Sequence, residues 1–246
     1  DRRLADYYFD VNQMPEAEEL YRQIRANSHA SDVKVTYRLA ETLIREGKFT
    51  DGNKLLDDDV LSKRPQDSKA LVLRSVALLS QGKPNDALTV LKDVLSRDGS
   101  DTDALFYRAS ALLALNQNLD QAARDLLAVR DSKSGNGPTA EAQLNSRMLL
   151  AQVYRQSRRY SEAAADYEDA IRKFPGIPGL RADYADYLLW LVDVQQHLAP
   201  SDEGATAFAV KSVGAEDRLR KLLDDSAKAF PNIVVWAVLD GRLAQA

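Results

Sequence analysis

The stretch from Leu150 to Pro175 has the clearest pattern of apolar and polar positions in the chain. Apolar or small side chains recur at the three- and four-residue spacing of a helix face, on both sides of a polar segment. They are Leu150, Ala151 and Tyr154 before that segment and Ala163, Tyr167, Ala170 and Ile171 after it. Pro175 ends the second run because proline cannot extend the hydrogen-bond ladder of a helix. The pattern predicts two amphipathic helices joined by a tight turn, with Ser161 as the N-cap of the second.

The same kind of helix pair recurs upstream at a spacing of about 34 residues. The segments 71–79 (LVLRSVALL) and 105–113 (LFYRASALL) align 34 residues apart without a gap. Small residues such as Ala151 and Ala163 leave room for two antiparallel helices to approach closely. One such pair cannot bury both of its apolar faces, so it needs neighbouring pairs stacked against it. The sequence therefore predicts a series of stacked helix pairs.

The segment from Leu150 to Pro175 resembles the tetratricopeptide repeat, a helix–turn–helix unit of about 34 residues. The positions that match are Leu150, Ala151, Tyr154, Tyr160, Ala163, Tyr167, Ala170 and Pro175. Ala151 replaces the glycine of the family pattern, and Arg147 stands where an opening aromatic residue is expected. The resemblance implies an all-α fold, a right-handed alpha-alpha superhelix (solenoid) of about six such helix pairs plus a terminal helix.

We expect a single repeat array over residues 1–246. Its units are 1–31, 32–66, 67–100, 101–136, 140–175 and 177–231, followed by a final helix over 233–246. Gly52 replaces the usual alanine of the second unit, and Asp57–Asp59 carries one residue more than its counterpart in the third. The final helix is either a cap or the first helix of a truncated seventh repeat. Two inserts interrupt the array, 132–139, which we interpret as a longer loop, and 199–214, whose role stays open.

The composition narrows the class of protein. Charged residues make up 28% of the chain, and 11 glycines and 8 prolines are few for its length, which is typical of a soluble helical protein. A formal net charge of −4 is too small to predict binding to nucleic acid or to a membrane surface. No apolar run approaches the ~18 residues of a membrane-spanning helix. The absence of cysteine excludes disulfides. We place the chain in the periplasm or the cytoplasm and favour the bacterial periplasm.

The sequence contains no recognisable catalytic constellation. His29 and His197 belong to no set with metal-ligand or nucleophile–base spacing, and we interpret both as surface residues. Asp57–Asp59 cannot converge on a cation, because consecutive helical side chains diverge by about 100°. The segment Gly135–Gly137 lacks the preceding strand and the Lys-Ser/Thr of a phosphate loop. We therefore predict a non-enzyme without a cofactor or a metal site.

The concave surface is the remaining candidate for function. In the family that this chain resembles, the first helices of the pairs line an inner groove that binds partners. The predicted groove residues are Tyr37, Arg38, Glu41, Arg45, Tyr107, Gln152 and Arg155, with Val72, Val76 and Met148 beside them. The arginines favour an acidic ligand, because arginine holds carboxylates through paired hydrogen bonds. Glu41 and Val76 occupy positions where some members carry the asparagines of a clamp for chaperone C-termini, so that activity is not expected.

Two further groups leave alternatives open. Arg74 and Arg108 lie 34 residues apart at equivalent places, where they either pack between repeats or hold an acidic ligand. Tyr184, Tyr187 and Trp190 share a broad face of one helix. We expect them to pack in the core; if exposed, they would stack on sugar rings or on an apolar peptide.

We predict a non-catalytic scaffold that binds a peptide or protein along the concave groove, with no nucleic acid and no membrane insertion. The oligomeric state stays open. One alternative is a periplasmic assembly segment of a bacterial envelope or exopolysaccharide export system. Another is a regulatory repeat array fused to an enzyme domain outside this chain. The chain opens on Asp1 without an initiating methionine, so we expect it to be a segment of a larger protein.

Overall fold

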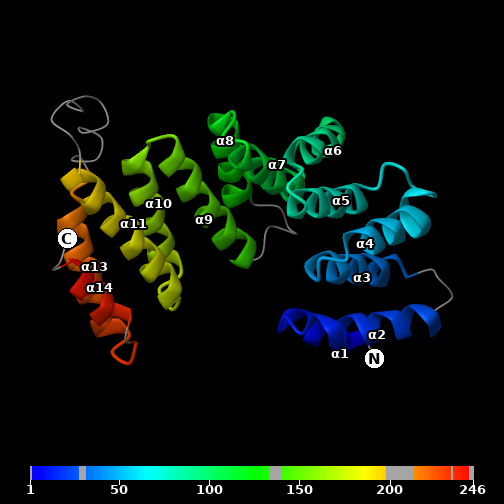
Figure 1. Cartoon of the computed structure of the whole chain (residues 1–246), viewed down its shortest axis with the longest axis horizontal. Coiled ribbons are helices and arrows are strands. Elements are labelled where there is room, and N and C mark those ends of the chain that lie inside the picture. The colour runs from blue at the N-terminus through cyan, green and yellow to red at the C-terminus, as the bar shows by residue number, and fades with distance from the viewer. Residues whose placement is uncertain (1, 28–31, 133–139, 198–212, 234, 244–246) are drawn as a thin grey trace. The chain divides into compact units, whose positions relative to one another are not determined.

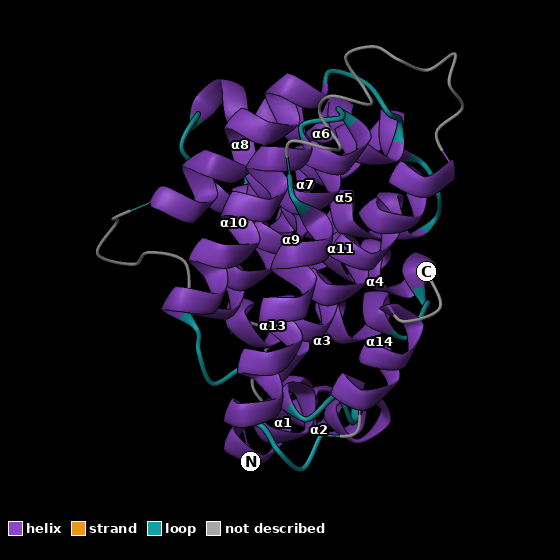
Figure 2. Cartoon of the chain, turned by 90° about the vertical axis from the view of Figure 1, so that its left-hand side faces the viewer, coloured by secondary structure: helices purple, strands orange, loops and turns teal. Residues whose placement is uncertain are grey.

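The computed structural model describes residues 2–27, 32–132, 140–197, 213–233 and 235–243, and all regular elements in these ranges are helices (Figures 1 and 2). Consecutive helices pack against each other in pairs. The predicted all-α solenoid is therefore confirmed. The chain divides into two compact units, Asp1–Val129 and Arg130–Ala246, which we describe separately.

The first unit contains the helices up to α8, whose last two residues belong to the second unit. Its elements are α1 (Arg2–Asp10), α2 (Met14–Asn27), α3 (Val33–Arg45), α4 (Phe49–Leu56), η1 (Asp57–Leu61), α5 (Ser68–Ser80), α6 (Pro84–Arg97), α7 (Thr102–Ala114) and α8 (Leu119–Asp131). Helix α1 packs on α2, α3 on α4 and α5 on α6, and each pair also contacts the next. Buried apolar clusters follow this series, because every pair needs its neighbour to cover its second face.

The second unit continues the same arrangement. Its elements are α9 (Ala140–Gln156), α10 (Tyr160–Lys173), α11 (Pro178–His197), α13 (Ala215–Ala229) and α14 (Val235–Leu243). Helix α9 packs on α10 and α11 on α13, while α14 contacts both α11 and α13. The repeat boundaries and the choice between a cap and a truncated repeat for the last helix stay predictions. Most of the two predicted inserts, 133–139 and 199–212, lies outside the described residues.

A residue with a left-handed backbone reverses the chain between the helices of each of five pairs. These residues are Asn12, Gly47, Gly82, Asn116 and Arg158, with φ angles between 51° and 79°. The next residue's N–H donates to the carbonyl five residues earlier, as Lys48 does to Leu43 and Arg159 does to Tyr154, both at 2.8 Å. This is a Schellman helix end, in which glycine fits without strain and a residue with a Cβ does not. Arg158 is therefore held in a conformation that its side chain disfavours.

Aspartates cap the first helices of three pairs. The Asp32 carboxylate accepts from the backbone N–H groups of Lys34 and Val35 at the start of α3. Asp67 and Asp101 do the same for α5 and α7 through the N–H groups three residues later. The predicted N-cap role of Ser161 is wrong. Helix α10 already begins at Tyr160, because the tight Schellman turn leads directly into it, and its N-cap residue Arg159 makes no side-chain capping bond.

Small residues lie at the closest approach of paired helices. Ala17, Ala87, Ala122 and Ala163 are all fully buried. A Cβ placed on Gly52 would lie 3.0 Å from Cγ1 of Ile44 and 3.2 Å from the backbone oxygen of Ala40. The second pair is therefore packed so tightly that even alanine would press on α3.

The extra residue at Asp57–Asp59 is absorbed by a π-helical turn. The backbone N–H of Ser62 donates to the carbonyl of Asp57, five residues earlier, at 2.9 Å. An inserted residue widens a helix in this way without ending it. Asp59 pairs with Arg25 of α2 at 2.8 Å, and Asp57 pairs with Arg74 of α5. These aspartates therefore bridge neighbouring helices.

Arg147 forms a buried ionic network at the position where the family pattern has an aromatic residue. Its guanidinium lies 3.1 Å from Asp166 and 2.8 Å from Asp169, and Arg130 reaches Asp166 at 2.9 Å. The side chains of Arg147 and Asp166 are only 2% and 4% exposed. Burial raises the pKa of Asp166 although both arginines act to lower it. The charged form of Asp166 thus has a large desolvation cost that its partners offset only in part.

We expect Ala163→Trp to lower the free energy of unfolding by about 3 kcal/mol, because the buried helix contact has no room for an indole. Ala165→Trp is the matched control, since Ala165 lies exposed on the same helix. That change should cost less than about 0.5 kcal/mol. Urea denaturation followed by circular dichroism measures both. Equal stabilities of the two variants would contradict the close packing of α9 and α10.

Arg158→Gly should raise the free energy of unfolding by about 1 kcal/mol, because it removes the strain of a left-handed arginine. Arg172→Gly, at a helical position whose side chain is 69% exposed, should instead lower it by about 1 kcal/mol. Thermal and urea denaturation of both variants shows whether each change raises or lowers the free energy of unfolding. A loss of stability in Arg158→Gly equal to that in Arg172→Gly would show that the turn is not strained.

Removal of Arg147 should leave Asp166 poorly compensated inside the second unit. We expect Arg147→Met to lower the free energy of unfolding by about 3 kcal/mol. The double variant Arg147→Met with Asp166→Leu should recover most of this loss, because it removes both buried charges. A double-mutant cycle measured by urea denaturation checks the coupling. Simple additivity of the two single effects would rule out the network as a coupled unit.

Candidate functional site

The predicted groove residues of α3 form a compact ionic and aromatic cluster in the first unit. Glu41 lies between two arginines, 2.9 Å from Arg45 and 3.8 Å from Arg38. The same two guanidinium groups lie 4.3 Å and 4.4 Å from the ring centroid of Phe9 on α1. Each arginine therefore has a carboxylate and an aromatic face as partners, which holds it in place. Their positive charge is already largely balanced within the cluster.

The two predicted tyrosines of the first unit have different surroundings. Tyr107 of α7 is largely buried, and its pKa is raised by burial and by the nearby charge of Glu41. It therefore lies close to the α3 cluster. The hydroxyl of Tyr37 instead donates to Asp67 at 2.6 Å, and burial together with this bond raises its pKa to about 12. Since Asp67 also caps α5, Tyr37 fastens one helix pair to the next.

In the second unit, Gln152 and Arg155 line a hollow of about 210 Å³. Met148, Ala151 and these two residues come from α9, Tyr167 comes from α10, and Asp183, Asp186 and Tyr187 come from α11. The guanidinium carbon of Arg155 lies 5.5 Å from the ring centroid of Trp190. The structure thus brings Gln152 and Arg155 together with an acidic and aromatic wall that the sequence did not indicate.

The two aspartates that line this hollow, Asp183 and Asp186, repel each other. Burial and the neighbouring charge of Asp186 raise the pKa of Asp183. Asp186 has a partner in Arg242, at 2.7 Å, and Asp183 has none among the described residues. The hollow therefore presents one arginine and one unpaired carboxylate, on opposite helices, to an incoming ligand.

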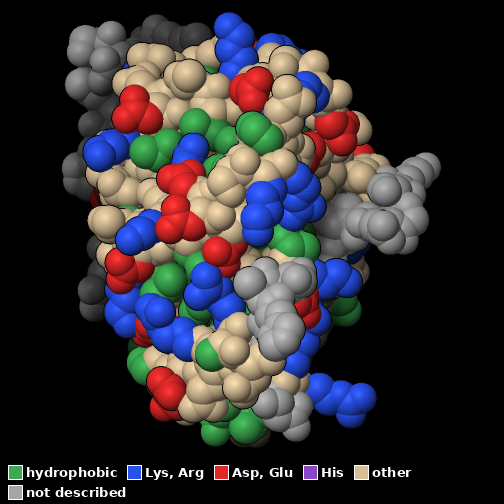
Figure 3. All heavy atoms as spheres, turned by 90° about the vertical axis from the view of Figure 1, so that its right-hand side faces the viewer, with side chains coloured by type: hydrophobic (Ala, Val, Ile, Leu, Met, Phe, Trp, Pro, Cys, Tyr) green, Lys and Arg blue, Asp and Glu red, His purple; other side chains and the backbone are tan. Residues whose placement is uncertain are grey.

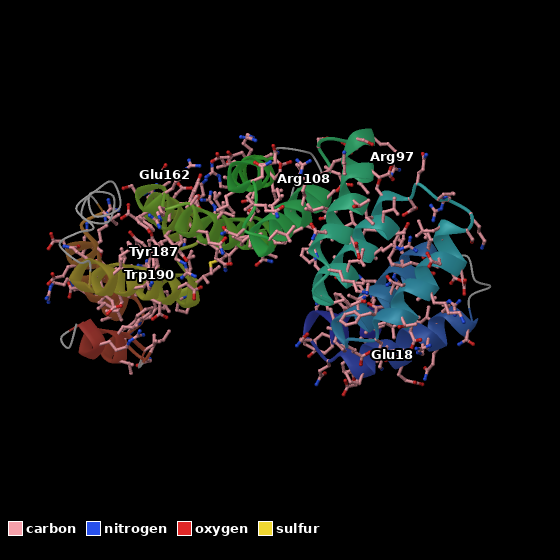
Figure 4. The ribbon with its side chains drawn as sticks, turned by 45° about the horizontal axis from the view of Figure 1, so that its top comes forward. Glu18, Arg97, Arg108, Glu162, Tyr187 and Trp190 are labelled. Carbon is pink, nitrogen blue, oxygen red and sulfur yellow. The ribbon has the colours of Figure 1, made fainter. Side chains whose placement is uncertain are left out.

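The expected core packing of the α11 aromatic residues is confirmed for Tyr184 and Tyr187, whereas Trp190 is half-buried. Tyr184 and Tyr187 are only 2% and 5% exposed, and Tyr187 lies beside Trp190 on the same helix (Figure 4). Tyr167 stacks on Tyr184 with ring centroids 5.1 Å apart. The hydroxyl of Tyr187 donates to the carbonyl of Tyr160 at 3.0 Å. Only one edge of this cluster, at Tyr167 and Tyr187, reaches the hollow.

Arg74 and Arg108, whose role the sequence left open, join neighbouring helices through ion pairs. Arg108 donates two hydrogen bonds of 2.7 Å to Asp125, whose side chain is 3% exposed, and so joins α7 to α8 (Figure 4). Arg74 pairs with Asp57. Neither guanidinium is left for an acidic ligand, which decides between the two interpretations.

The described part of the remaining surface carries mixed charge. On the face shown in Figure 3, lysine and arginine are interspersed with aspartate and glutamate. The described residues contain no group of three or more His, Asp or Glu that could hold a metal ion. Among the described helices, none combines the length and the apolar character needed to cross a bilayer. His29, the side chain of His197 and Gly135–Gly137 lie outside the described residues.

Sequence reasoning missed Phe9, Asp183 and Asp186. Phe9 had a usable signal, because it lies on the first helix of the first pair, where groove residues are expected. The two aspartates also lie on a first helix, three residues apart. They were overlooked because the aromatic residues around them dominate that segment.

Solved structures with the same arrangement of helices exist. A thermophilic tetratricopeptide repeat protein of Thermus thermophilus matches with a TM-score of 0.64 and 22% identity over 76% of this chain and 96% of its own. A tetratricopeptide repeat protein from Parabacteroides merdae matches with a TM-score of 0.52 and 16% identity over 98% of this chain and 96% of its own. The MamA protein gives a TM-score of 0.54 at 18% identity, over 80% of this chain and 90% of its own. At these identities the likeness concerns the fold.

The sequence itself carries the family signal. The tetratricopeptide repeat model matches residues 72–138 and 147–197, which include the stretch from Leu150 to Pro175. No curated protein matches the chain. The repeat model and the paired-helix structure agree, and residues 72–138 and 147–197 are tetratricopeptide repeats.

Proposed function

We propose that this chain is a non-catalytic scaffold that binds a peptide or a segment of a protein on the first helices of its repeats. Tetratricopeptide repeats generally serve protein–protein interaction and are typically not catalytic. The hollow beside Gln152 and Arg155 is the observation that carries the proposal, because it combines an open surface with fixed polar and aromatic groups. Such a surface suits an extended peptide, which needs hydrogen-bond partners and aromatic contacts.

Arg155 is the anchor that we propose for an acidic group of the ligand. Of the groove arginines, Arg38 and Arg45 share Glu41, whereas Arg155 has no carboxylate partner among the described residues. Contact with the face of Trp190 holds the Arg155 guanidinium without using its N–H donors in ion pairs. A ligand carboxylate therefore meets a positioned donor on α9, across the hollow from Asp183 and Asp186 of α11.

The first unit supplies the second proposed contact surface, made of Arg38, Glu41, Arg45 and Tyr107 with Phe9. Here the balanced charges favour hydrogen bonding and aromatic contact over attraction of a strongly acidic segment. Tyr37 contributes indirectly, because its bond to Asp67 holds the helix that carries the cluster.

Selection from a library of short random peptides against the 246-residue chain tests this proposal. We expect the selected peptides to carry aspartate or glutamate and to bind Arg155→Glu about tenfold or more weakly, because a charge-assisted bond becomes a repulsion. Arg220→Glu is the matched control, since Arg220 lies exposed on α13 outside the hollow. Fluorescence anisotropy with the selected peptides measures both affinities. Equal affinity of the two variants would place the binding surface elsewhere.

A further inference from the structure

A second cavity in the second unit shares no residue with the groove hollow. It has a volume of about 390 Å³ and lies where α10, α11 and α13 meet. That volume falls within the roughly 300–1,000 Å³ of typical small-molecule sites. Ile171 and Leu222 provide apolar wall, and the ring of Tyr184 closes one side. The cavity is therefore large enough for a small charged group together with the part of the molecule that carries it.

The charges around this cavity are unequal. Four cationic side chains line it, Arg172, Arg181, Arg218 and Lys221, against the two carboxylates of Glu168 and Asp225. Glu168 is already held on both sides, by Arg218 at 2.5 Å and by the hydroxyl of Tyr184 at 3.0 Å. Asp225 is exposed on α13, where water screens its charge. Arg172 is likewise paired with Asp169, at 3.2 Å, so the positive excess of the cavity rests on Arg181 and Lys221.

Two of the cations have no partner in the part of the chain that the structure describes. The Nε–H of Arg181 is buried and has no hydrogen-bond acceptor, and its guanidinium carbon lies 5.8 Å from the ring centroid of Phe230. Lys221 is exposed at the cavity and makes no ion pair. A buried donor without an acceptor is rare in folded proteins, because it loses its bond to water and gains nothing. An anion in the cavity would satisfy it.

We propose that this cavity binds a phosphate monoester group. Two unpartnered cations, with Arg218 and Arg172 beside them, match the double negative charge of a phosphate better than the single charge of a carboxylate. Planar guanidinium groups can each offer paired donors to phosphate oxygens, and the lysine adds a mobile point charge. The apolar wall at Ile171 and Leu222 takes the carbon atoms that the ester carries. This site is independent of the proposed groove function, because the two sets of lining residues do not overlap.

Isothermal titration calorimetry of the 246-residue chain with O-phosphoserine, at constant ionic strength, tests the site. We expect saturable binding by the unchanged chain and a loss of about tenfold or more in affinity for Lys221→Gln and for Arg181→Gln. Lys228→Gln is the matched control, because Lys228 lies on α13 outside the cavity and pairs with Asp224 at 2.6 Å. Its affinity should equal that of the unchanged chain. Circular dichroism checks that each variant folds. If Arg181→Gln unfolds, the affinity of Lys221→Gln alone tests the site, because Lys221 is exposed and its replacement should not disturb the fold.

Three further titrations define the ligand. Acetate should bind far more weakly than phosphoserine, since it carries half the charge. The phosphate monoester is then offered from two sources, on a phosphoserine peptide and on glycerol 3-phosphate. The ligand with the higher affinity identifies the source. The proposal fails if no phosphate ester binds saturably, if Lys221→Gln and Lys228→Gln bind equally well, or if acetate binds as tightly as phosphoserine.

Discussion

The close approach of two helices around a small buried residue is the constraint on which the rest of this structure depends. Ala17, Gly52, Ala87, Ala122 and Ala163 keep the paired helices near each other; the four alanines are fully buried, and a Cβ on Gly52 would press on α3. Such a short separation requires a tight reversal between the helices, which the left-handed residues at the Schellman turns provide. It also leaves each pair with an uncovered apolar face, so that stacking on the next pair follows from the same packing.

Ion pairs between helices then decide which charges remain for function. Arg25, Arg74 and Arg108 are paired with aspartates of neighbouring helices, and Arg147 is buried with two of them. A charge used in this way stabilises packing and has few donors left for a ligand. Arg155, Arg181 and Lys221 differ because none of them forms an ion pair in the described chain, although carboxylates line the same cavities. The two proposed sites of the second unit are built around these three cations.

Much of the fold followed from local chemistry. The gapless match between 71–79 and 105–113 indicates the repeat, and the small residues indicate close helix pairs. The predicted cap Ser161 does not cap its helix, since the Schellman turn before it starts α10 at Tyr160, two residues before the predicted start. For the site, Gln152 and Arg155, which were chosen by their first-helix positions, line a hollow, and their role in binding stays a prediction. The nearness of Asp183 to Arg155 depends on how α11 packs beside α9 and α10, which the first-helix positions alone do not specify.

The spacing of small, aromatic and turn residues in the sequence is enough to specify the helices, their pairing and their stacking. These features depend on contacts within about one repeat, which a local pattern records. The sequence alone does not show which partner each charged side chain has. Tyr37 bonds to Asp67, 30 residues away, and Arg218 reaches Glu168 across 50 residues. Such pairings depend on how neighbouring helices rotate against one another. An ångström-scale shift at a helix contact makes or breaks a hydrogen bond, so the free and the satisfied charges could be told apart only once the packed helices were in view.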